Sequence, residues 1–88
     1  MTRLKTGDVV SHFKREYVAD ASTNLKHVYK ILCMDAIDTR TDEKVVVYQG
    51  LYPPYAVFTR PLEEFLSEVD KSKYPDVKQA YRMELYRG

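Results

Sequence analysis

The adjacent prolines Pro53 and Pro54 constrain the fold of this chain most, because neither can donate a backbone hydrogen bond to a neighbouring strand. The β-branched run at residues 45–47 precedes them and predicts a strand over residues 43–51. Residues 55–59 are predicted to form the next strand and to pair back on residues 43–51. The prolines therefore predict an antiparallel hairpin.

Three other segments also favour β structure. Apolar residues alternate over residues 8–14, and residues 27–36 are apolar on both faces apart from Lys30, which predicts a central strand. Polar residues 15–26 predict a long surface connection with room for one helical turn, and residues 38–42 predict a hairpin connection. Alternation over residues 81–86 predicts a closing strand, although the same spacing also fits a continued helix.

Helical spacing appears after the proline hairpin. Pro61 suits the first position of a helix, and Leu62, Phe65, Leu66 and Val69 then recur at helical spacing, which predicts a helix over residues 61–69. Residues 75–79 are compatible with a second helical turn. The predicted fold is mostly β with one short helix (α+β): a small antiparallel five-stranded curled sheet or a partly open SH3-like barrel, in a single domain of residues 1–88.

Composition narrows the class of protein. A chain of 88 residues buries only about 60–65% of its unfolded surface, so large aromatic side chains are expected in the core. Its 14 basic and 13 acidic residues create no overall field that attracts nucleic acid or a membrane. The chain shows neither an apolar run of roughly 20 residues nor a signal peptide, so the expected location is cytoplasmic. Cys33, the single cysteine, is expected to be a buried, inert thiol.

Four motifs give the chain a family resemblance. They are GDVVSHFK (residues 7–14), VVYQGLY (46–52), RPLEEF (60–65) and KYPDVKQAYRME (73–84). With them the chain resembles the uncharacterised family called domain of unknown function 1653, with Gly50 standing where members commonly carry alanine. The resemblance implies no established activity.

The best candidate site combines aromatic rings with one fixed cation. Gly50 is expected to leave a gap beside Tyr48, and Arg60 is expected to reach the first amides of the helix that follows it. Together these features suit a small planar anion. The predicted ligand-binding residues are His12, Tyr48, Gln49, Tyr52, Tyr55 and Arg60.

Simpler interpretations of the same residues stay open. Arg60 can pair with Glu63 or Glu64, and the tyrosines can be buried in the core with only their hydroxyls bonded. No catalytic motif, metal cluster or cofactor loop is present in the sequence, so no catalytic residue, metal ligand or cofactor is predicted.

The sequence therefore predicts a non-enzymatic binding module for a small anionic ligand or an acidic segment of a protein partner. Two alternatives remain. The first is single-stranded nucleic acid held by the same aromatics and by scattered basic residues such as Lys14 and Lys30. The second is an enzyme that uses His12 as acid or base. No membrane partner is expected, and the sequence does not define an oligomeric state.

Overall fold

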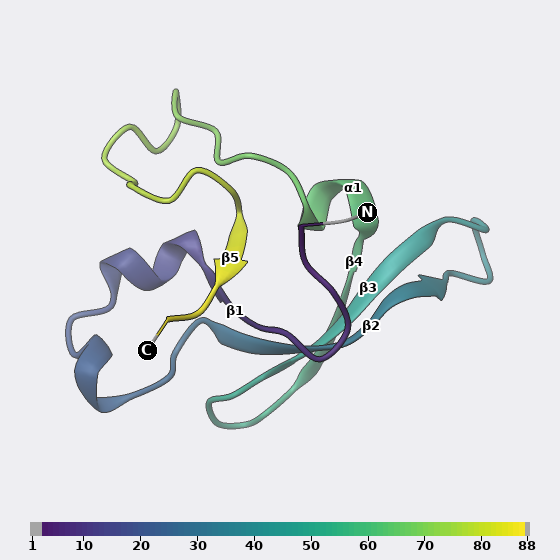
Figure 1. Cartoon of the computed structure of the whole chain (residues 1–88), viewed down its shortest axis with the longest axis horizontal. Helices are drawn as coiled ribbons and strands as arrows, with labels where there is room; N and C mark the ends of the chain where they lie inside the picture. Colours follow the sequence, from purple (N-terminus) through teal and green to yellow (C-terminus); the bar gives the residue numbers. More distant parts are fainter. Residues whose placement is uncertain (1–2, 88) are drawn as a thin grey trace.

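A computed structural model describes residues 3–87 and shows one five-stranded antiparallel sheet (Figure 1). The strand order is β4-β3-β2-β1-β5, so β2 is the central strand, as its sequence predicts. The sheet is curled and is not closed, which confirms the mostly β prediction with one short helix. The strands are β1 (Val9–His12), β2 (Val28–Ile37), β3 (Lys44–Gly50), β4 (Val57–Pro61) and β5 (Met83–Leu85).

The two central hairpins follow the predicted pattern. β2 and β3 are joined by a turn in which the amide of Asp42 donates to the carbonyl of Asp38 at 2.7 Å. β3 and β4 are joined through Pro53 and Pro54, and β4 pairs with β3 in the register Tyr48↔Phe58. The prolines thus lie in the connection, outside the strand ladder.

One face of the sheet carries the main core and is here called the inner face. Residues directly opposite in an antiparallel pair share a face, so the register places alternate side chains together there. Phe65 of the single α-helix, α1 (Leu62–Phe65), is fully buried against this face, with its ring centroid 5.1 Å from that of Tyr48. The inner face comprises Val10, His12, Tyr29, Ile31, Val46, Tyr48, Phe58 and Arg60.

The helix is shorter than predicted. It ends at Phe65 instead of Val69, and Pro61 is the last residue of β4 rather than the first of the helix. Beyond it, the amide of Val69 donates to the carbonyl of Ala80 at 2.9 Å, and Glu68 forms an isolated bridge with Tyr81. Pairing with residues 80 and 81 therefore takes the place of the last helical turn that was predicted up to residue 69.

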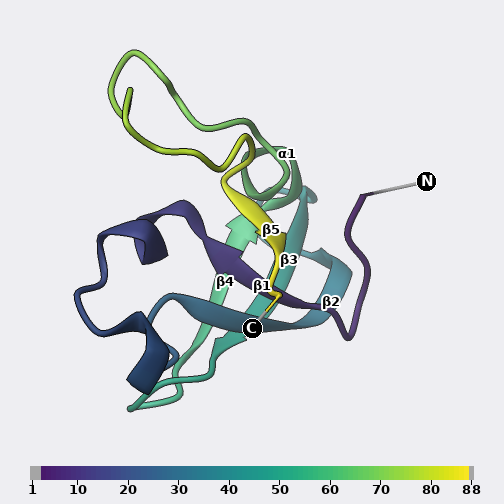
Figure 2. The same ribbon diagram turned by 60° about the vertical axis from the view of Figure 1, so that its left-hand side comes forward.

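Residues 66–82 form an irregular segment that loops away from the sheet on the side of α1 in both views (Figures 1 and 2). The helical turn considered at residues 75–79 is wrong, because the amides of Lys78 and Gln79 donate to the carboxylate of Glu16 at 2.9 and 2.8 Å. The closing strand is confirmed over Met83–Leu85, so the alternative of a continued helix is also wrong.

The first strand also ends early. β1 stops at His12, and two short 3-10 helices follow: η1 (Phe13–Tyr17) and η2 (Ala21–Thr23). They occupy much of the connection in which a single helical turn was expected. Phe13 turns away from the strand and is buried with Val69 and Val77 in a second small core.

Two further predictions from the sequence concern the burial of Cys33 and membrane-spanning segments. Cys33 is half-buried rather than buried, and its thiol donates to a carboxylate oxygen of Asp35 at 3.3 Å. Among residues 3–87, no helix has the length and apolar character needed to cross a bilayer.

Candidate functional site

Two tyrosines of the predicted site, Tyr48 and Tyr52, form a cluster on the inner face with Tyr29 of β2, which was not predicted. The ring of Tyr29 meets those of Tyr48 and Tyr52 edge-on, at centroid distances of 5.2 and 5.7 Å. The hydroxyls of Tyr29 and Tyr52 lie 3.0 Å apart, and burial together with this hydrogen bond raises the pKa of Tyr29. Tyr29, Tyr48 and Tyr52 are called the tyrosine cluster below. Edge-on rings with bonded hydroxyls are the usual arrangement of tyrosines in a core.

Arg60 joins this cluster from β4. Its Nε donates to the hydroxyl of Tyr48 at 3.5 Å, and its Nη1 pairs with the carboxylate of Glu64. The bond to Tyr48 is the main cause that raises the pKa of Arg60. The pairing with Glu64 is the simpler of the two roles expected for Arg60. Its guanidinium bonds the side chains of Tyr48 and Glu64, and the expected bond to the first amides of α1 is not among these contacts.

The gap expected at Gly50 is filled. The ring of Tyr52 folds back over this glycine, so that a Cβ built on Gly50 would lie 3.1 Å from Cε1 of Tyr52. A missing side chain in a strand does mark a close approach here, but the approaching group belongs to the same chain.

Gln49 and Tyr55 lie away from the tyrosine cluster. Gln49 neighbours Tyr48 in β3 and therefore faces the opposite side of the sheet, where its Nε2 donates to the carbonyl of Tyr55 at 2.9 Å. Tyr55 has a φ of 61°, a conformation that is rare outside glycine, and its side chain is exposed. These two residues hold the turn between β3 and β4.

His12, also of the predicted set, is a buried residue, with 8% of its surface exposed. Its Nδ1 accepts the amide N–H of Lys14 at 3.0 Å. Burial, and next to it the charge of Arg82, lowers the pKa of His12 to about 3. A group with so low a pKa binds protons weakly near neutral pH, which counts against the hypothesis of an acid–base role.

Arg82 is the residue that sequence reasoning missed. Its Nη1 lies 3.5 Å from Nε2 of His12, and its Nε is buried with no hydrogen-bond partner among residues 3–87. The register of β1 with β5, which pairs His12 with Met83, brings this arginine beside the histidine. In the sequence it is one charged residue in an alternating segment, which is too general a signal to mark a site.

A cleft of about 320 Å³ connects Arg60 with Arg82. Both arginines are half-buried, whereas the three carboxylates of the lining, Glu64, Glu68 and Asp70, belong to exposed residues. The remaining lining residues are Phe13, Lys14, Val69, Lys73 and Tyr74. The cleft thus brings Arg60 together with residues 66–82 and excludes Tyr52 and Tyr55, which were predicted to share its ligand.

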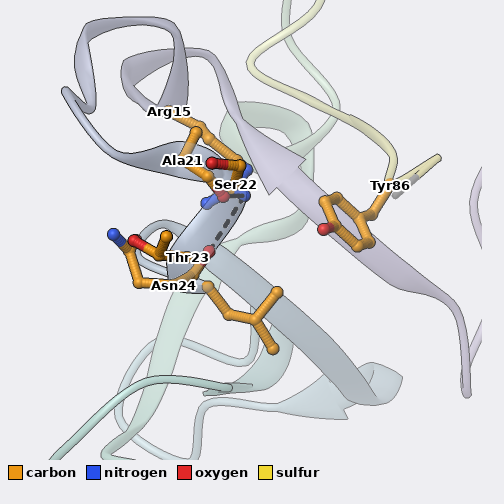
Figure 3. Close-up of a pocket in the computed structure, with 7 residues that line it drawn as sticks. Arg15, Ala21, Ser22, Thr23, Asn24 and Tyr86 are labelled. Atoms are coloured by element: carbon orange, nitrogen blue, oxygen red, sulfur yellow. Dashed lines mark hydrogen bonds between the residues drawn. The ribbon is translucent and has the colours of Figure 1, made fainter.

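A larger hollow lies between η2 and Tyr86 (Figure 3). Its one charged side chain is Arg15, whose guanidinium donates to the carbonyls of Ala21, Asn24 and Lys26 at 2.7, 3.1 and 2.9 Å. Arg15 therefore holds the loop, with both terminal nitrogens of its guanidinium bonded to backbone carbonyls of the chain. Over the part of the chain that the structure describes, no group of three His, Cys, Asp or Glu is placed to hold a metal ion.

The fold and the cleft define a small, open, antiparallel β domain with two arginines beside its helix. The chain belongs to the family described as "Protein of unknown function (DUF1653)", whose model matches residues 8–85. Searches of curated proteins and of solved structures found no match to this chain.

Proposed function

We propose that the protein is a non-enzymatic binding module that takes a small anionic ligand in the cleft beside Arg60 and Arg82. The observation that carries this proposal is the contrast within the lining: Arg60 and Arg82 are half-buried residues, whereas the three carboxylates belong to exposed residues, of which Glu64 is paired with Arg60. A partly buried cation is screened less by water and salt than an exposed acid is. An anion that enters the cleft is therefore attracted more than it is repelled.

The shape of the cleft supports a compact, planar ligand. The rings of Phe13 and Tyr74 line it, with their centroids 4.7 Å apart, and offer apolar surface beside the cations. A volume of about 320 Å³ is near the lower end of the range, roughly 300–1,000 Å³, that is typical of small-molecule pockets. An acidic side chain of a protein partner would supply the same chemistry.

Titration of ¹⁵N-labelled protein tests the proposal. The probes are adenosine monophosphate, benzoate, an acidic peptide and a single-stranded oligonucleotide, with amide shifts followed at Arg60, Tyr74 and Arg82. We expect adenosine monophosphate or benzoate to shift these amides, and Arg60→Gln to weaken the binding about tenfold, since one charge-assisted hydrogen bond is worth about 1.5–3 kcal/mol. Arg40→Gln is the control, because its side chain is 86% exposed in the β2–β3 hairpin.

Each other outcome has a defined meaning. Absence of shifts with every probe would reject the binding module. Binding of the oligonucleotide alone, with a steep dependence on salt, would instead favour the nucleic-acid alternative.

We also propose a cytoplasmic location and an SH3-like relationship for the curled sheet. The half-buried thiol of Cys33, which is in no disulfide bond within residues 3–87, supports the first, since free thiols persist in reducing compartments. The return of β5 to the side of β1 supports the second. Cell fractionation tests the location, and comparison with further family structures tests the relationship.

A further inference from the structure

The hydrogen bonds of His12 fix where its proton lies. Nδ1 accepts the amide N–H of Lys14 at 3.0 Å, so it carries no proton of its own. A neutral imidazole must then carry its proton on Nε2. This Nε2 lies 3.5 Å from Nη1 of Arg82, which is also a donor and has no capacity to accept. Two donors therefore face each other without an acceptor between them.

Arg82 has a second N–H donor without a partner. Its Nε is buried and makes no hydrogen bond within residues 3–87. A buried donor left without an acceptor lowers the stability of the fold, and lowers it more when the group is charged. The arrangement therefore favours any acceptor that can enter between the two side chains.

The backbone of Arg82 is held firmly in spite of this. Its carbonyl accepts the amide of Phe13 at 3.0 Å and Nε2 of Gln79 at 3.3 Å. The same Gln79 amide also donates to the carbonyl of Ser11 at 2.9 Å, which ties the segment to β1. His12 is fixed by its own strand and by Lys14. The ring of His12 and the backbone of Arg82 are thus positioned before any ligand binds, which lowers the entropic cost of binding.

From these contacts we infer that the His12–Arg82 pair is an oxyanion subsite, in which one oxygen of a phosphate or carboxylate accepts from Nε2 of His12 and from the guanidinium of Arg82. The inference rests on the proposed function and specifies it, because Arg82 also lines the cleft. Two donors 3.5 Å apart can share one oxygen at ordinary hydrogen-bond distance from each. The anionic group of the ligand then lies at this end of the cleft, and the rest of the molecule extends toward Arg60.

Inorganic phosphate and acetate are the probes that test the subsite. We expect either probe to shift the Nε2 signal of His12 in long-range ¹H–¹⁵N spectra of the wild-type protein, and we expect the proton to stay on Nε2. Phosphate is expected to bind the more tightly if the natural group is a phosphate, and acetate if it is a carboxylate.

Two variants remove the donors one at a time. Arg82→Gln is expected to weaken binding of the preferred probe at least tenfold, since it removes a charged donor group. In His12→Asn, the amide oxygen of asparagine can take the place of Nδ1 as the acceptor for the amide of Lys14. The Nε2 donor is lost, so we expect probe binding to weaken about tenfold. Arg40→Gln removes the same charge at an exposed position and should leave binding unchanged.

The result separates failure of the subsite from failure of the proposed function. If both probes bind with the same affinity to Arg82→Gln but more weakly to Arg60→Gln, the cleft binds anions and the subsite is wrong. If neither probe shifts His12 or any residue of the cleft, while adenosine monophosphate still binds, the subsite is likewise wrong. If no probe binds at all, both proposals fall.

Discussion

The tyrosine cluster and the His12–Arg82 pair differ in how their polar atoms are satisfied, although both lie beside the inner face of the sheet. Each hydroxyl of the cluster has a partner: Tyr29 and Tyr52 bond each other, and Tyr48 accepts from Arg60. At the other end, His12 and Arg82 direct donors at each other. The aromatic side chains thus mark the core of this domain, whereas the unmatched donors mark the place where we propose that a ligand binds.

The largest expected effect tests the structural role of the aromatic core. Phe65→Ala should lower the free energy of unfolding by about 3–5 kcal/mol, because the ring is fully buried against Tyr48. Urea unfolding measures the change. Tyr55→Ala is the control, since an exposed ring should contribute less than about 0.5 kcal/mol. If Phe65→Ala lowered the free energy of unfolding only slightly, the assignment of the aromatic side chains to the core would be contradicted.

The next effect concerns the pH dependence of stability at His12. Burial and the charges of Arg82, His27, Lys14 and Arg60 lower its pKa from 6.5 to about 3 in the folded state. Between these two values the unfolded chain binds a proton that the folded chain does not, so stability falls as the pH falls.

Comparison with His12→Asn isolates this contribution. We expect the wild type to lose up to about 1.4 kcal/mol per pH unit relative to the variant below pH 6.5, and the difference to be constant above it. Urea unfolding of both proteins at several pH values provides the measurement. A constant difference over the whole range would show that His12 is not buried in its neutral form.

A smaller effect is expected from the contact that holds residues 66–82. Glu16→Ala removes the acceptor of the Lys78 and Gln79 amides and should cost about 1–2 kcal/mol, because water can partly replace it at this exposed position. We also expect weaker phosphate binding, since the segment that carries Arg82 loosens. Glu43→Ala, in the exposed β2–β3 turn, is the matched control. Unchanged phosphate affinity in Glu16→Ala would mean that Arg82 is positioned by β5 alone.

The smallest effect is expected at Gly50. A Cβ there would lie 3.1 Å from the ring of Tyr52, which is half-buried and can move by a few tenths of an ångström. Gly50→Ala should therefore change stability by less than about 1 kcal/mol and leave phosphate binding unchanged. Thermal unfolding and phosphate titration measure the two quantities. A clear loss of phosphate affinity in Gly50→Ala would instead indicate that the ligand binds at the tyrosine cluster.

Local pattern predicted the parts of the fold that local interactions decide. The alternation and β-branched residues of β2 and β3, and the two prolines after them, predicted the central hairpins well. Residues 66–82 were not predictable in the same way, because their amides bond to side chains far along the chain, such as Glu16.

The candidate site shows the same limit. Tyr48 and Arg60 lie in one continuous stretch, so their proximity could be inferred from a hairpin. His12 and Arg82 are 70 residues apart and meet through the pairing of β1 with β5. The register of that pairing depends on the complete sheet and not on either segment alone.

The tautomer of His12 tests the central claim most directly. Long-range ¹H–¹⁵N spectra near neutral pH should show a neutral ring with the proton on Nε2 and a bare Nδ1, as the hydrogen bond from Lys14 requires. A proton on Nδ1 would contradict the account, because Nε2 would then accept from Arg82 and the two side chains would satisfy each other.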